Sequence, residues 1–154
     1  TFSNIEGKYR LGLETSKLHK NNKVTLNVSA IGYNYFSEVV DIDITKVTQQ
    51  DFSLISQKIG IRGQVIDSDS KIGIDSHSKI GIGSAKIEVD KESGFTLSDF
   101  QGNYRLGIKT PLNKEKVKVT LNVSATGYKE VDEEVDIDLT KVTKKDFSLE
   151  SQAN

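Results

Sequence analysis

The segment KVTLNVSATGY, Lys118 to Tyr128, decides the fold class of this chain. Its apolar residues Val119, Leu121 and Val123 alternate with polar ones, which is the period of a β-strand with one buried face. The segments NYRLGI, EEVDIDL, DFSLE, IRGQVID and SAKIEVD alternate in the same way. No segment shows an apolar period of 3.6 residues, and clusters of Gly, Asn, Asp and Ser separate the alternating runs. The sequence therefore predicts an all-β sandwich protein.

The same segment occurs 95 residues earlier as KVTLNVSAIGY, Lys23 to Tyr33. Residues 1–57 align with residues 96–152 without a gap, and 33 of these 57 positions are identical. This degree of identity indicates a tandem duplication, so the chain should contain two related copies.

The second copy carries a front portion, about residues 59–95, that the first copy lacks. We therefore expect residues 1–57 to form a partial β-sandwich repeat and residues 58–154 a complete one, with a loop or hairpin insertion at 67–83. The first unit would be either a crop from a longer array or a domain completed by another chain, because an open sheet edge recruits further strands.

The second copy contains an ordered set of motifs that resembles the carboxypeptidase regulatory-like domain, a transthyretin-like β-sandwich. The motifs are GQVID (Gly63–Asp67), SAKIEV (Ser84–Val89), TLSDFQGNYRL (Thr96–Leu106), VTLNVSATGY (Val119–Tyr128) and the closing DFSL. The resemblance covers residues 59–151 and implies two tandem Ig-like or transthyretin-like units, the first lacking its N-terminal strands. It implies no catalytic residue, and such domains usually accompany a peptidase, an outer-membrane transporter or a surface protein.

Composition excludes several functions. The formal net charge is -1, so the chain has no broad basic field for nucleic acid or anionic lipid. No apolar run approaches the ~18 residues that a membrane-spanning helix needs. The chain has no Cys and no Met, and we expect it to be a processed or excised piece of a longer protein.

The sequence predicts no enzyme and no cofactor. Its two histidines, His19 and His77, lie in polar loops of different copies, and no G-x-S-x-G motif is present. Carboxylates alternate along two strands, Asp41 with Asp43 and Asp136 with Asp138. Such pairs are typical of a solvated face, with a surface cation site as the alternative.

The stretch DSDSKIGIDSHSKIGI, residues 67–82, is an octapeptide written twice with one change. Its carboxylates Asp67, Asp69 and Asp75 are weak metal candidates, since the calcium-loop pattern fails at Lys71, Ile72 and Ser78. Three readings stay open: a tolerated insertion, a metal loop, or a hairpin interaction arm. The side chains that the arm would present are Ile72, Ile74, Ile80 and Ile82.

The tripeptide NVS begins at Asn27 and again at Asn122 and fits an N-glycosylation acceptor. The simpler interpretation is that it recurs because the domain recurs.

The expected function is a non-catalytic structural or adhesive module of an extracellular or cell-surface protein. Self-association, or binding to other surface proteins, could build filaments by strand addition. The alternative is an accessory module, binding carbohydrate or protein, attached to a secreted enzyme. Any aromatic platform would be confined to the first copy, where Tyr33, Tyr35 and Phe36 cluster. A third interpretation is a peptidase-associated folding domain.

Overall fold

The computed structural model describes residues 1–13, 22–68, 80–90, 93–109 and 114–152. In these ranges it is all-β, as predicted, with no helix. The described residues accordingly contain no helix that is long and apolar enough to cross a membrane. The strands are β1 (Asn22–Val28), β2 (Phe36–Ile42), β3 (Gly60–Asp67), β4 (Lys86–Asp90), β5 (Gly94–Leu97), β6 (Asn103–Gly107), β7 (Lys116–Ser124), β8 (Val131–Asp138), β9 (Thr143–Lys144) and β10 (Phe147–Leu149).

Contacts divide the chain into two compact units. The first comprises Thr1–Leu26 and Glu38–Asp51, and the second comprises Asn27–Ser37 and Phe52–Asn154. A segment that belongs to the first copy by sequence, residues 27–37, is therefore part of the second unit. The domain boundary expected between residues 57 and 58 stays a prediction.

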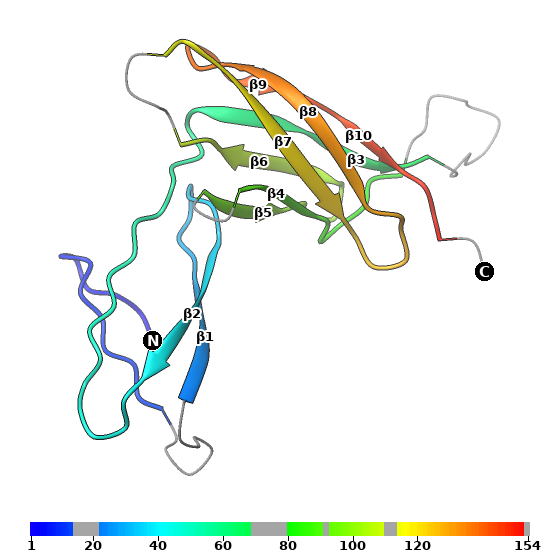
Figure 1. The fold of residues 1–154 in the computed structure, drawn as a ribbon. Helices are drawn as coiled ribbons and strands as arrows, with labels where there is room; N and C mark the ends of the chain where they lie inside the picture. The colour runs from blue at the N-terminus through cyan, green and yellow to red at the C-terminus, as the bar shows by residue number, and fades with distance from the viewer. Residues whose placement is uncertain (14–21, 69–79, 91–92, 110–113, 153–154) are drawn as a thin grey trace. The chain divides into compact units, whose positions relative to one another are not determined.

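The second unit consists of two sheets that share one core (Figure 1). One sheet has the order β10-β3-β6, with β9 also paired to β3, and the other has the order β5-β4-β7-β8. Strand β3 runs antiparallel to β6 and parallel to β9 and β10. The arrangement is consistent with a β-sandwich.

Most of the alternating residues that the sequence assigns to the core are buried there, while Val89, Val119, Ala125 and Val135 are partly buried and pack against it. Leu121 and Val123 of β7 are fully buried, and their neighbours Thr120 and Asn122 are not. The remaining core side chains come from the other predicted strands and from the segment before β4: Ile61, Val65, Ile82, Ala85, Ile87, Tyr104, Leu106, Ile108, Ile137, Leu139, Phe147 and Leu149. The short strands β5 and β9 were not predicted.

The edge strand β8 carries an inward-pointing charge. Glu133 lies opposite Leu121 in the β7–β8 register, on the face that otherwise carries Val131, Val135 and Ile137. Its carboxylate forms an ion pair with Lys145, with 2.7 Å between Nζ and Oε1. Inward charges of this kind oppose edge-to-edge pairing with further strands.

The turn predicted at Asp99–Gly102 is confirmed. The Asp99 carboxylate accepts hydrogen bonds from the amides of Gln101 and Asn103, and Gly102 has a φ of 84°. The first copy repeats these bonds with the side chain of Asn4, which stands where the second copy has Asp99.

The first copy forms only the two-stranded sheet β1–β2 among its described residues. Three of its apolar side chains, Leu26, Phe52 and Leu54, are half-buried. Their counterparts Leu121, Phe147 and Leu149 are almost fully buried. The same residue types thus reach different degrees of burial, because the second copy adds the strands of its front portion.

A short Asp-x-Thr turn follows β8 and recurs after β2. Asp138 Oδ1 accepts bonds from the amide and the hydroxyl of Thr140, at 2.9 and 2.6 Å, and Asp43 does the same with Thr45. These bonds favour the ionised carboxylate and hold the pKa of Asp138 below its usual value.

We expect Asp138→Asn to reduce the loss of unfolding free energy that the wild type shows as the pH falls into the acid range. A carboxyl with a lowered folded-state pKa contributes stability above its unfolded pKa, near 3.8, and loses it as pH falls through the folded value. Urea unfolding near neutral pH should show the variant less stable than wild type, and the difference should vanish well below pH 3.8. A constant difference at all pH values would contradict the prediction.

Candidate functional site

A loop of the first copy, residues 30–35, forms one wall of the candidate site. The amide of Tyr33 donates to the carbonyl of Ala30 at 3.2 Å, and Tyr33 bridges to Ser56. The second copy closes the same turn with Tyr128, Ala125 and Ser151. The backbone of the two loops is therefore alike, and what distinguishes them is the side chains that follow the tyrosine.

Asn34 is the buried residue of this loop, with 1% of its surface exposed. Its Nδ2 donates to the carbonyls of Ser93 and Gly107 at 2.9 and 2.8 Å, and its Oδ1 accepts from the amide of Gly107 at 2.8 Å. The side-chain amide thus binds the backbone just before β5 and at the end of β6. We call this set of bonds the Asn34 lock.

Next to the Asn34 lock, Tyr35 pairs with Phe95 of β5. Tyr35 and Phe95 exchange two backbone hydrogen bonds of 2.7 and 3.0 Å, and their rings stack with centroids 5.6 Å apart. The ammonium of Lys86 lies 4.6 Å from the centre of the Phe95 ring. The loop is therefore held by backbone pairing and ring stacking, as well as by Asn34, and the cation–π contact fixes the Phe95 ring on which Tyr35 stacks.

Two glycines leave room for segments of the first copy, Gly94 for Tyr35 of the loop and Gly107 for Ser56. A Cβ on Gly107 would lie 2.1 Å from the carbonyl oxygen of Ser56, and one on Gly94 would lie 2.2 Å from that of Tyr35. Both clashes are with backbone, which cannot swing aside as a flexible side chain could. Gly94 also has a φ of +80°, a conformation that favours glycine.

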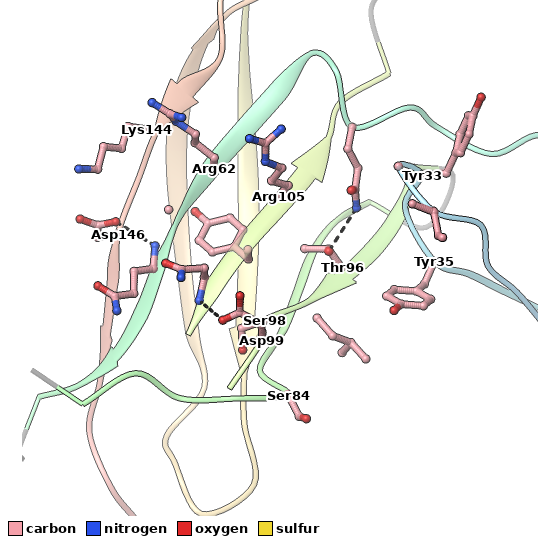
Figure 2. Close-up of a pocket in the computed structure, with 18 of the residues that line it drawn as sticks. Tyr33, Tyr35, Arg62, Ser84, Thr96, Ser98, Asp99, Arg105, Lys144 and Asp146 are labelled. Carbon is pink, nitrogen blue, oxygen red and sulfur yellow. Dashed lines mark hydrogen bonds between the residues drawn. The ribbon is translucent and has the colours of Figure 1, made fainter. Parts of the chain in front are cut away.

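A groove of about 860 Å³ runs from this loop across β5 and over the outer face of β3, β6 and β9 (Figure 2). Most of its wall is polar, with side chains such as Gln57, Gln64, Thr96 and Asn103. At the loop end stand Tyr33 and Tyr35, each with more than a third of its surface exposed.

Three cations cross the outer face of the sheet in one row at the other end of the groove. Arg62 on β3 pairs in register with Arg105 on β6 and with Lys144 on β9. Figure 2 shows Lys144, Arg62 and Arg105 following one another toward Thr96 and the tyrosines. We call these three residues the basic row.

No ion pair neutralises the basic row within the described part of the chain. The carboxylates that line the groove, Asp99 and Asp146, accept hydrogen bonds from backbone amides, in the case of Asp146 from Gln64 at 2.9 Å. Burial, with smaller contributions from Asp146 and Glu133, raises the pKa of the Tyr104 hydroxyl, so this groove residue stays neutral. The groove lining therefore carries a small excess of positive charge, three cations against two carboxylates, and none of the three cations is held in an ion pair among the described residues.

The metal candidates from the sequence do not assemble in the described residues. Asp67 accepts a hydrogen bond from the hydroxyl of Tyr128 at 2.8 Å, while Asp69 and Asp75 lie outside the described residues. No group of three or more metal-binding side chains occurs in the ranges that the structure covers.

The candidate interaction arm lies mostly outside the described residues. Ile72 and Ile74 are not described, Ile80 is partly exposed, and Ile82 is buried in the core. Residues 80–82 pair with β3, since the amide of Ile82 donates to the carbonyl of Val65 at 2.8 Å. Strand addition by this arm stays a prediction.

The two candidate glycosylation asparagines lie on strands. The side-chain amide of Asn122 donates to the carboxylates of Glu130 and Asp132, and the Oδ1 of Asn27 accepts from the hydroxyl of Ser37 at 2.6 Å. Their use as acceptors remains untested.

Sequence reasoning missed Asn34 and the basic row. A signal for Asn34 was present, because the copies are identical over much of this region but diverge abruptly at Asn34 and Tyr35, where the second copy has Lys129 and Glu130. The basic row had no such signal, because its members come from strands far apart in sequence.

Comparison with protein-family models and with curated proteins finds no match for this chain. The resemblance to the carboxypeptidase regulatory-like domain therefore rests on the sequence motifs alone.

We expect Gly107→Ala to destabilise the second unit by about 1–3 kcal/mol, because its new methyl group must displace the backbone at Ser56. Gly12→Ala is the matched control, since Gly12 is the first-copy counterpart and a Cβ there meets no atom within 4 Å. Thermal and urea unfolding of the two variants would measure the difference. Equal stability of the two variants would contradict the close approach.

Proposed function

We propose that the chain is a non-catalytic structural module from an array of transthyretin-like β-sandwich repeats in an extracellular or cell-surface protein. The fold of the first copy would be the partial form of the second, and the first copy would be connected to the second through its 30–35 loop. The observation that carries the proposal is the Asn34 lock. A residue of the first copy is buried among backbone groups of the second and forms three hydrogen bonds there.

The choice of a polar side chain supports a connecting role. An apolar residue at position 34 would also exclude water, but it would not choose among orientations of the loop. A side-chain amide is fully satisfied only where backbone carbonyls face its NH2 group and a backbone N–H faces its oxygen. Such a contact holds residues 27–37 of the first copy in one register against the ends of β5 and β6, which suits a connection between repeats.

The corresponding loop of the second copy lacks the residue that makes this contact, which supports a specific connecting role for Asn34. Lys129 stands at the position of Asn34, and its ammonium forms an exposed ion pair with Glu150 at 3.2 Å. Its charge could not be buried in the position of Asn34 without a partner. The two copies thus share a backbone turn but differ at the next residue, which is Asn34 in the first copy and Lys129 in the second.

We expect Asn34→Ala to destabilise the chain by about 2–5 kcal/mol, because buried groups at Ser93 and Gly107 lose their partners. Lys129→Ala is the matched control and should change stability by less than about 1 kcal/mol, since an exposed ion pair contributes little. Urea unfolding measures both.

Hydrogen exchange then tests whether the lock holds the copies together. The amides of Asn34 and Tyr35 should be protected in wild type and lose protection selectively in Asn34→Ala. Asn34→Asp should have a similar effect near neutral pH, because a carboxylate would face two carbonyl oxygens. If residues 27–37 keep their protection in both variants, the lock does not join the copies and the proposal fails.

A further inference from the structure

The basic row is a departure from the usual pattern of a sheet surface. Like charges placed directly opposite on neighbouring strands destabilise a sheet, and strands lie only about 4.8 Å apart. Arg62 has a cation opposite it on both sides, Arg105 and Lys144. A surface that served only as a spacer would gain stability by replacing one of the three with a neutral or acidic residue. The row is therefore better explained by a ligand that supplies negative charge.

The groove limits the class of that ligand. Arginine forks bind carboxylate and sulfate groups through two parallel hydrogen bonds. Beyond the row, the wall offers amide and hydroxyl groups of Gln57, Thr96 and Asn103, which suit a ligand rich in hydroxyls. At the far end Tyr33 presents an exposed ring, which suits the apolar face of a sugar.

Peptides and nucleic acids fit the groove less well. Peptide recognition commonly uses backbone pairing at a sheet edge or apolar anchor pockets. Arg62, at the middle of the row, lies on β3, which is paired on both sides. The strand β6 ends its sheet, so a peptide could pair along β6 but not across the row. A nucleic acid draws most of its affinity from many phosphate contacts along its backbone, and the three cations of the basic row offer few of these.

We propose that this groove binds an anionic polysaccharide, with the basic row contacting its carboxylate or sulfate groups and Tyr33 contacting a sugar ring. The activity goes beyond the structural role, and it does not depend on the Asn34 lock holding an array together. A module of this kind would attach the parent protein to an acidic glycan surface.

Calorimetric titration of the full chain with four defined polymers tests the proposal. The probes are polygalacturonate for carboxylates, dextran sulfate for sulfates, dextran as the uncharged polysaccharide and poly-L-glutamate as the acidic peptide. We expect binding to at least one of the anionic polysaccharides, weakening as salt is added, and no binding to dextran. The anionic polysaccharide that binds more tightly shows whether the basic row prefers carboxylate or sulfate groups.

Variants then assign the binding to the groove. Arg62→Gln and Arg105→Gln should each weaken binding by about 10-fold, as expected for loss of a charged hydrogen bond. Tyr33→Ala should weaken it as well. Arg10→Gln is the matched control and should bind as wild type, because Arg10 is the first-copy counterpart of Arg105 and is not part of the groove lining.

A melting curve separates loss of the ligand site from loss of the fold. Arg62→Gln should not lower Tm, because it removes repulsion from both neighbours in the row. The proposal is overturned if neither anionic polysaccharide binds at low salt, or if Arg10→Gln weakens binding as much as Arg62→Gln. Tighter binding of poly-L-glutamate, with the same response to the variants, would replace the polysaccharide with an acidic peptide and also overturn it.

Discussion

Strand β3 is the element on which one whole sheet of this protein depends. β6, β9 and β10 all pair with it, and its residues Ile61 and Val65 are buried in the shared core. The match between the copies begins at Thr96, so residues 1–57 contain no counterpart of β3. Without a central strand, the first-copy residues that correspond to β6 and β10 have no partner of this kind. Their segments are accordingly not strands in the described structure.

The Asn34 lock shows how a duplicated sequence acquires a specific contact. Both copies keep the turn that ends in Tyr33 or Tyr128, because its bonds are local and need no partner domain. At the next residue the first copy has a buried amide, where the second copy has an exposed lysine. The surrounding backbone accepts it because Gly94 carries no side chain to obstruct Tyr35, and Gly107 carries none to obstruct Ser56, which bridges to Tyr33. The lock therefore needs one polar residue and two glycines from separate parts of the chain.

The groove contains charged residues that lower the stability of the sheet and that suit the binding of a ligand. Its carboxylates are held by backbone amides, the pKa of its buried tyrosine is raised, and its three cations face one another across the sheet. Local rules for stable sheets are commonly broken at functional sites and compensated elsewhere. Here the compensation is the dense core beneath β3 and β6, where Ile61 and Leu106 are almost completely buried.

The sequence by itself determined the all-β class, the core residues and the main turns. These follow from alternation and from residues such as Asp99 and Gly102, whose bonds are made within a few positions of the chain. It did not determine the short strands β5 and β9, which are too brief to show a period. Only the tertiary structure decided that Asn34 is buried and that Arg62, Arg105 and Lys144 stand side by side. The physical reason is that these contacts join residues tens of positions apart in the chain. Local alternation shows which face of a strand a residue occupies, but not which strand lies beside it.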